Sequence, residues 1–489
     1  MIERAGSAPA DIEPGLLAAT LRRAGEGCQV RRVEVRELPA LVDGLRGSDL
    51  LIAIERAPPE ANEALAIGIA GEGFDGDLTS DSTRTDGYVL TTDVAPTILG
   101  RLGIGVPSAM SGQAIRAEGS VDVAGIEVLG GRMAVVSERR GPVIGVSLLV
   151  WLAVFGLTAL VGSGRVARVA VRLLALSVVY LPLLLLAGAA LEPSQESEQL
   201  LAMFGAPLLA ASTLLVFRGY RALAVASGLV VLAYALDVIA GSPLTSLSLL
   251  GPNPGLGVRF YGIGNELEAL LAVLVVAGTG AVLAGFRPAL DKRRCALAFA
   301  VTGLLAALVF AAGRFGADVG AAIVMPIGAA AAVYKVATPW RHAALALIMT
   351  AFFVFLGFIA VIDLLTGANA HLTRSVLDAG GLGEVADVAQ RRLQLSAHSF
   401  TRPVVLAFLP LVLGLAALAA WERDVLRSWL QDAPALWAGL LGALAATVAG
   451  TLANDSGALV LEVGSAYLLV FAGFAWAEGT ARSSTLRSS

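Results

Sequence analysis

Long apolar runs separated by short polar connections fill the chain from residue 143 almost to its C-terminus. Each run is about 20 residues long, which is the length that an α-helix needs to cross a bilayer. The pattern therefore predicts eleven membrane-spanning helices, at 143–162, 173–190, 200–217, 222–241, 267–286, 295–312, 319–334, 343–365, 404–421, 435–453 and 457–477.

Basic residues are concentrated in every second connection between these runs. They are Arg165, Arg168, Arg172, Arg218, Arg221, Arg287, Lys292, Arg293, Arg294, Lys335, Arg341, Arg423, Arg427, Arg482 and Arg487. Connections rich in Lys and Arg stay on the cytoplasmic side of a membrane. The sequence thus predicts an extracytoplasmic N-terminal part and a cytoplasmic C-terminus, although Arg139 and Arg140, just before the first run, oppose this orientation.

Composition supports a multi-pass membrane protein. Of 489 residues, 56% are hydrophobic and 15% are charged, and the mean hydropathy is +0.77. The net charge of -4 is too small to indicate a nucleic acid as partner. Cys28 and Cys295 fall on opposite sides of the membrane in this topology, and no zinc or redox motif surrounds them. We therefore expect no metal site and no cofactor.

The N-terminal part, residues 1–140, has the pattern of a small α/β domain. We expect helices at 15–24 and 38–46, and strands at 29–35, 50–54 and 65–70. The continuous apolar run at 50–54 suits a buried parallel strand. A domain outside the cytoplasm must be exported, yet no apolar signal segment follows Met1. We expect a missing upstream segment, or a first span that inserts with its N-terminus translocated.

Residues 91–115 read TTDVAPTILGRLGIGVPSAMSGQAI and begin like a capped helix, with Pro96 in its first turn. This wording, after a strand and a Gly-rich turn, resembles the C-terminal part of alkaline-phosphatase-like hydrolases and transferases over about residues 15–125. The resemblance implies the fold of that superfamily, whose catalysis uses Asp and His metal ligands. Here Glu55 and Arg56 follow the strand, and no histidine precedes His342. We therefore expect a partial domain without metal chemistry.

Acidic residues in and after the Gly-rich turn leave two interpretations open. They are Asp75, Asp77, Asp81, Asp86 and Asp93. Together they could bind a cation, or each could serve a turn or a helix start. We favour the second interpretation, because Asp is a common turn and cap residue.

Polar side chains gather at the ends of the spans on the predicted outer side, where such groups are costly in lipid. We interpret Asp318, Asp455 and Glu462 as candidate catalytic residues that act as a general base. The candidate substrate-binding residues are Arg259, Tyr261, Asn265, Glu266, Arg314, His371, Arg374, His398, Arg402 and Asn454. They are expected to line one outward-facing cavity that receives an anionic group; the alternative is a set of tight hairpins with structural ion pairs.

The expected order of parts is an outer domain (1–140), a membrane domain (141–478) and a cytoplasmic tail (479–489). This order resembles the phosphoethanolamine transferases of the lipid anchor and bacterial envelope proteins of unassigned activity. The resemblance implies an envelope protein that handles a lipid-linked phosphate or glycan at the outer leaflet, with membrane lipids as partners. A lipid or glycopolymer flippase and a non-catalytic assembly factor remain alternatives.

Overall fold

The computed structural model describes residues 15–55, 64–107, 110–256, 259–285, 290–337 and 422–486, apart from single-residue gaps at 28, 48 and 111. It also describes 340–343, 393–401 and isolated positions between 346 and 417. The chain divides into two compact units. The first contains Met1–Val135 and Asn253–Phe260, and the second contains Val136–Pro252 and Tyr261–Ser489.

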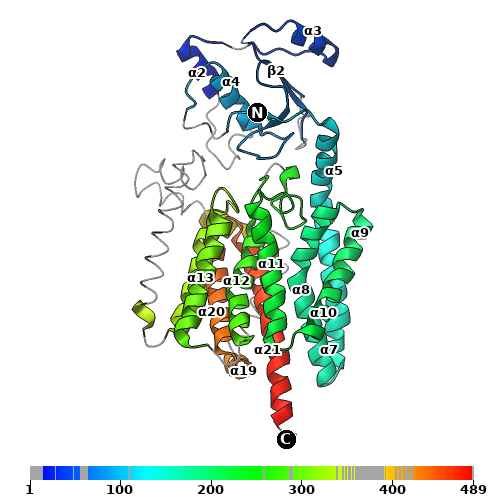
Figure 1. Ribbon diagram of the computed structural model, residues 1–489, viewed down its shortest axis with the longest axis vertical. Helices are drawn as coiled ribbons and strands as arrows, with labels where there is room; N and C mark the ends of the chain where they lie inside the picture. Colours follow the sequence, from blue (N-terminus) through cyan, green and yellow to red (C-terminus); the bar gives the residue numbers. More distant parts are fainter. Residues whose placement is uncertain are drawn as a thin grey trace. The chain divides into compact units, whose positions relative to one another are not determined.

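The first unit holds two short antiparallel strand pairs and a few helices (Figure 1). Strand β1 (Leu51–Ile54) pairs with β2 (Ile67–Ala70), and β3 (Asp77–Thr79) pairs with β4 (Arg116–Glu118). Its helical elements are α2 (Leu16–Ala24), η1 (Val35–Glu37), α3 (Leu38–Asp43), η2 (Thr91–Asp93), α4 (Val94–Arg101), η6 (Pro254–Leu256) and the first part of α5 (Val123–Arg140). Leu21, Leu99 and Met110 form its buried apolar cluster.

Two strand predictions for this unit are wrong. The strand at 50–54 forms as β1 but runs antiparallel to β2, because the connection 55–66 is at the lower limit of length for a parallel crossover. Strand β1 is also half-buried instead of covered on both faces. Residues 29–34 form no strand, and Val30 is exposed, since the alternating pattern there finds no partner strand.

The second unit is a bundle of long apolar helices. Nine helices in the described part of the chain are long and apolar enough to cross a membrane. They are Val123–Val161, Arg165–Leu191 (α8), Gln195–Val216, Tyr220–Ile239 (α11), Asn265–Gly285 (α12), Lys292–Ala311 (α13), Val319–Val336 (α14), Pro434–Ala453 (α20) and Gly457–Gly479 within α21 (Gly457–Leu486). They confirm nine of the predicted spans; the spans predicted at 343–365 and 404–421 lie largely outside the described residues.

Two of these helices contain π-helical turns. The first span is built from α5, η3 (Gly141–Gly145), α6 (Val146–Trp151), η4 (Leu152–Gly156) and α7 (Leu157–Val161), and the third from α9 (Gln195–Leu200), η5 (Leu201–Gly205) and α10 (Ala206–Val216). A π-turn leaves backbone groups without their usual α-helical partners. The Trp151 indole N–H donates to the Met203 carbonyl of η5 at 2.8 Å, which joins the two helices at these turns.

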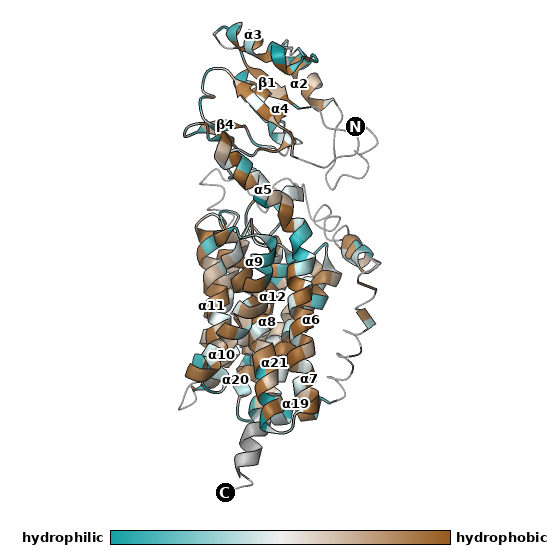
Figure 2. Cartoon of the chain, turned by 90° about the vertical axis from the view of Figure 1, so that its right-hand side faces the viewer, coloured by the Kyte–Doolittle hydropathy of each residue, from teal (hydrophilic) through white to brown (hydrophobic). Residues whose placement is uncertain are grey.

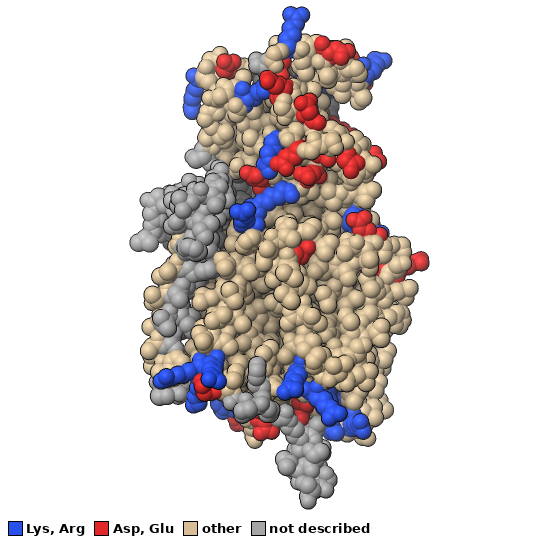
Figure 3. Space-filling model, in the orientation of Figure 1, with Lys and Arg blue, Asp and Glu red and all other residues tan. Residues whose placement is uncertain are grey.

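The bundle has two ends with different chemistry. We call the end formed by 192–194, 241–252, 261–264, 312–318 and 454–456 the polar end. We call the other end, formed by 162–164, 217–219, 290–291 and 430–433, the basic end; the short helix α19 (Arg423–Trp429) packs against α21 there. Apolar residues cover the helices between the two ends (Figure 2). The visible side of the bundle in Figure 3 is nearly uncharged, and Lys and Arg gather at its lower, basic end.

Helix α12 lies at the centre of the bundle, where most of its residues are buried. Glycines let its neighbours approach closely. A Cβ atom at Gly439 of α20 would lie 2.9 Å from the Val276 carbonyl oxygen of α12, and one at Gly442 would lie 2.5 Å from the Gly328 carbonyl oxygen of α14. The small residues at every fourth position of α20, including Gly442 and Gly450, are all buried, as their spacing indicates.

Proline in α8 creates a contact between helices. Pro182 has no N–H, so the carbonyl of Val178 four residues earlier loses its helical partner. The Tyr467 hydroxyl of α21 donates to that Val178 oxygen at 3.2 Å. In lipid, such a freed carbonyl needs a partner from a neighbouring helix. This bond thus ties α21 to α8 within the apolar part of the bundle.

Candidate functional site

Three polar turns that lie far apart in the sequence meet at the polar end. The Ile263 N–H donates to the Gly316 carbonyl at 2.9 Å, which joins the start of α12 to the turn between α13 and α14. Asn265 Nδ2 donates to Asp455 Oδ1 at 2.8 Å, which joins the same helix start to the turn between α20 and α21. Gly262 has φ +78°, and any side chain there would collide with the Gly316 backbone.

Glu268 is the buried centre of this arrangement. It lies in the first turn of α12, and none of its surface is exposed. Asn454, at the end of α20, donates from Nδ2 to Glu268 Oε2 at 2.8 Å. Gly450 of α20 lies beside the carboxylate, since a Cβ there would be in van der Waals contact with Glu268 Oε1 at 3.5 Å. A carboxyl group is therefore held where α12 and α20 meet, inside a membrane-spanning bundle.

The same carboxylate approaches the start of α14. A Cβ atom at Gly320 would collide with Glu268 Oε2 and would lie 2.9 Å from Asn454 Oδ1. Asp318 precedes the helix, is buried, and accepts from the Gly320 N–H at 3.1 Å. The positive end of a helix dipole stabilises negative charge nearby. Two acidic side chains, Glu268 and Asp318, are thus gathered around Gly320 at this helix start.

Glu462 of α21 differs from these acids. It is half-buried, and its Oε1 atom is buried without a hydrogen-bond partner among the described residues. An acidic side chain in a membrane span is costly unless it has a partner or a function. Glu462 therefore remains a candidate for proton exchange, although no described contact joins it to Glu268.

Two ion pairs stabilise the rim of the polar end. Arg139 Nη1 lies 3.1 Å from Glu198 Oε2 and also donates to the Pro193 carbonyl at 2.9 Å. Arg140 Nη1 lies 3.0 Å from Glu266 Oε1, and its Nη2 donates to the Gly251 carbonyl at 2.7 Å. These partners explain how two arginines are accommodated at the start of the first span. They also mean that Glu266, a predicted substrate-binding residue, is engaged in a structural ion pair.

The remaining predicted residues are distributed more widely. Arg259 belongs to the first unit and Tyr261 to the second. Arg314 is exposed in the turn before α14, and His398 is exposed in the helical turn at 393–399. His371, Arg374 and Arg402 lie outside the described residues. The structure thus brings together Asn265, Asn454, Asp455 and Asp318. It adds Glu268, which was not among the residues predicted for the site.

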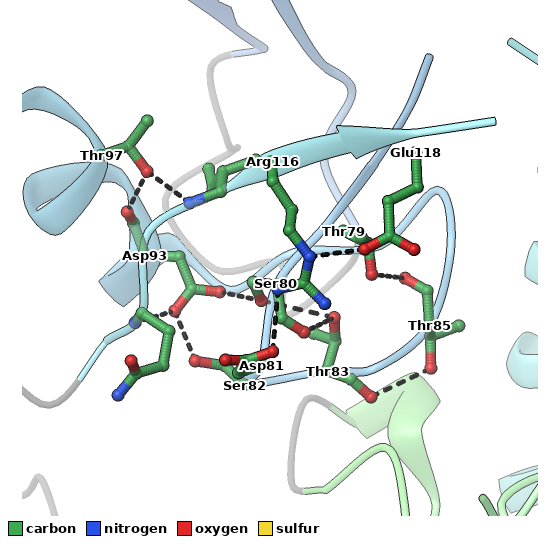
Figure 4. A network of polar contacts seen from close by, with 12 residues as sticks. Thr79, Ser80, Asp81, Ser82, Thr83, Thr85, Asp93, Thr97, Arg116 and Glu118 are labelled. Atoms are coloured by element: carbon green, nitrogen blue, oxygen red, sulfur yellow. Dashed lines mark hydrogen bonds and ion pairs between the residues drawn. The ribbon is translucent and has the colours of Figure 1, made fainter. Parts of the chain in front are cut away.

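Two of the acids in the first unit, Asp93 and Asp81, are used in contacts within that unit. Asp93 is fully buried and accepts from Ser80 Oγ at 2.7 Å, from Ser82 Oγ at 2.6 Å, and from the N–H groups of Leu90 and Gln113 (Figure 4). Asp81 pairs with Arg116 at 2.8 Å, and the hydrogen bond from Arg116 to Glu118 raises the pKa of the guanidinium. No group of three potential metal ligands occurs among the described residues.

Comparisons with protein-family models, curated proteins and solved structures find no match for this chain.

Proposed function

We propose that this multi-pass membrane protein acts on a lipid-linked substrate at the polar end of its helix bundle, as a transferase of the cell envelope. The observation that carries the proposal is Glu268, a fully buried carboxyl group held by Asn454 at the start of α14. Acidic groups inside membrane proteins persist at considerable cost in free energy and mark functional positions by default. The orientation that places this end outside the cytoplasm rests on the alternation of basic connections.

The chemistry that suits this arrangement is proton removal from an acceptor hydroxyl. Glu268 is the proton acceptor, and Asn454 holds its carboxylate in one orientation. Exposed Arg314 lies in the turn that packs against the start of α12, where it would bind a phosphate group through two parallel hydrogen bonds. Because Glu268 has no exposed surface, the acceptor hydroxyl reaches it only when the turns at 312–318 and 454–456 move apart, while the donor phosphate stays at the rim.

The first unit is proposed to be a partial alkaline-phosphatase-like domain that helps to bind the substrate and carries out no metal-dependent catalysis. Support comes from the order of β2, the Gly-rich turn and α4, and from Asp93, whose carboxylate accepts hydrogen bonds from Ser80, Ser82, Leu90 and Gln113 of the same unit. Metal analysis of the purified full-length protein tests this. Zinc bound in a stoichiometric amount would contradict the proposal.

The transferase proposal can be tested with the full chain in vesicles of phosphatidylethanolamine and phosphatidylglycerol. Phosphatidylethanolamine offers a phosphoryl donor and phosphatidylglycerol an acceptor hydroxyl, so transfer releases diacylglycerol and forms a larger glycerophospholipid that mass spectrometry detects. Glu268→Gln keeps the size of the side chain but removes the base, and we expect at least about a hundredfold loss of rate. Glu196→Gln, an exposed acid in α9, is the matched control and should leave the rate unchanged.

One observation favours a second function. The unpartnered Oε1 atom of Glu462 inside α21 is suited to proton-coupled transport. In that case a fluorescent phospholipid in the same vesicles would cross the bilayer without a new lipid product, and Glu462→Gln would stop its movement. Formation of the larger lipid by the wild type, with no effect of Glu462→Gln, excludes this alternative.

A further inference from the structure

The basic end contains a pocket that the proposed function does not use. Its volume is about 340 Å³, and it is lined by 216–221, where α10 ends and α11 begins, and by Ala284 and Gly285 at the end of α12. The three candidate spans that meet here end or begin at Val216, Tyr220 and Gly285. The pocket therefore lies at the boundary of the apolar part of the bundle, at the depth of lipid head groups.

Two arginines give the pocket its charge. Arg218 and Arg221 are both exposed, and Arg221 Nε donates to the Gly285 carbonyl at 3.1 Å. This bond fixes the Arg221 guanidinium against the end of α12. Within the described part of the chain, neither the Arg218 guanidinium nor the terminal nitrogens of Arg221 have a hydrogen bond or an ion pair. Both groups are free to bind an anion from the pocket.

The start of α11 adds to the attraction for an anion. Gly219 precedes the helix with φ 62°, and no side chain caps the first N–H groups of α11. Uncapped helix starts favour phosphate groups, which accept from backbone N–H groups. One acid lies close by: Glu478 Oε2 is 3.7 Å from the position of a Cβ on Gly219. Its charge is balanced by Arg172, whose Nε lies 2.9 Å from Glu478 Oε1.

Apolar surface continues from the pocket along the bundle. Leu215 and Val216 are 87% and 72% exposed, on a helix that is long and apolar enough to cross a membrane. Such side chains face lipid tails. We propose that the pocket binds an anionic phospholipid of the adjoining leaflet, with its phosphate on Arg218 and Arg221 and an acyl chain along Leu215 and Val216. Basic pockets between membrane helices bind anionic head groups in this way.

Native mass spectrometry of the full-length protein, purified with equal amounts of phosphatidylglycerol and phosphatidylcholine, tests the site. We expect the wild type to retain phosphatidylglycerol over phosphatidylcholine by about tenfold. Both lipids offer a phosphate, but the choline ammonium cancels the net charge of phosphatidylcholine and is repelled by the two arginines. The double variant Arg218→Gln/Arg221→Gln should bring this ratio close to one. Arg293→Gln, an exposed arginine at the same end in α13, is the matched control and should keep the wild-type ratio.

Two further measurements make the result decisive. Arg221→Gln also removes the bond to Gly285, so Arg218→Gln alone, which removes no described bond, should lower the ratio by about threefold in a normally folded protein. Inorganic phosphate in excess distinguishes a lipid site from a simple anion site, since a lipid also held by its acyl chain resists displacement. Equal retention by wild type and double variant, or complete displacement by phosphate, overturns the proposal.

Discussion

The two ends of the helix bundle differ in how much of their charge is paired at close distance. At the polar end, acids and amides are paired with one another at close distance, as in Asn454–Glu268 at 2.8 Å and Arg140–Glu266 at 3.0 Å. The basic end has one such close pair, Arg172–Glu478 at 2.9 Å, but its pairs Arg427–Asp424 and Arg294–Asp291 measure 3.8 and 3.5 Å, and all four of these side chains are more than half exposed. The polar end is therefore joined by internal contacts, whereas the basic end presents much of its charge to the surroundings.

This difference distinguishes charged side chains that stabilise the fold from charged side chains that remain available to bind a ligand. Buried pairs are strongly destabilised when one partner is removed, because the other is left uncompensated. Exposed pairs contribute little, but their charges remain available to lipids and solvent. We therefore expect substitutions at the polar end to change stability, and substitutions at the basic end to change lipid binding with little change in stability.

The largest expected effect is that of Gly320→Ala at the polar end. The new Cβ collides with Glu268 Oε2, and the carboxylate has little room to move, because it is fully buried and held by Asn454. We expect a loss of about 3 kcal/mol, the upper range for overpacking. Gly228→Ala in α11 is the control, since a Cβ there meets nothing within 4 Å. Thermal unfolding of both variants in detergent measures the difference; similar melting temperatures would contradict the crowding at Gly320.

Asn454→Leu is expected to have the next largest effect. It removes the amide that holds Glu268 and leaves a buried carboxyl group without that hydrogen bond. The loss should be about 2 kcal/mol, in the range for hydrogen bonds to charged groups. A double-mutant cycle with Glu268→Leu checks this, because the second change should be less costly once Asn454 is gone. Additive losses would show that the two side chains do not interact.

How far the sequence predicts these features depends on whether they are local. Nine spans were predicted because long apolar runs report their own length, and the polar turns were recognised because each is a break between runs. The sequence does not predict that Glu268 is the buried centre of the polar end. Residues 266 and 268 are separated by about 200° around a helix, so only one of them faces the interior. Helix α12 is apolar on all other sides, and its sequence does not indicate which face is buried.

The sequence also does not predict which residues pair when they lie far apart along the chain. By their position before the first span, Arg139 and Arg140 oppose the predicted orientation of the chain in the membrane. Their acidic partners, Glu198 and Glu266, lie 59 and 126 residues away and are brought close only by the packed bundle. The antiparallel direction of β1 and β2 is a similar case, because the apolar run at 50–54 suits either direction. The features that the sequence does not predict are therefore mostly contacts between segments that are distant along the chain.

Glu198→Gln should cause a loss of stability between those expected for Asn454→Leu and for the exposed pairs of the basic end. Glu198 is almost fully buried, whereas its partner Arg139 retains some exposure to solvent. Removing the charge leaves Arg139 with its bond to the Pro193 carbonyl, so the expected loss is about 1 kcal/mol. Unfolding measured at low and high salt should show the same loss, since a buried pair is weakly screened. A loss that disappears in high salt would place this pair with the exposed ones.

Arg427→Gln at the basic end should have the smallest effect. Its distance of 3.8 Å to Asp424 and the exposure of both side chains, 58% and 82%, make the pair weak, and we expect a change below about 0.5 kcal/mol. The same unfolding measurement used for Glu198→Gln provides the comparison, and Arg427→Gln should also leave lipid retention unchanged because Arg427 lines no part of the pocket at 216–221. If Arg427→Gln destabilises the protein as much as Glu198→Gln, burial does not separate the two ends. Their contrast would then lie only in the sign of their charge.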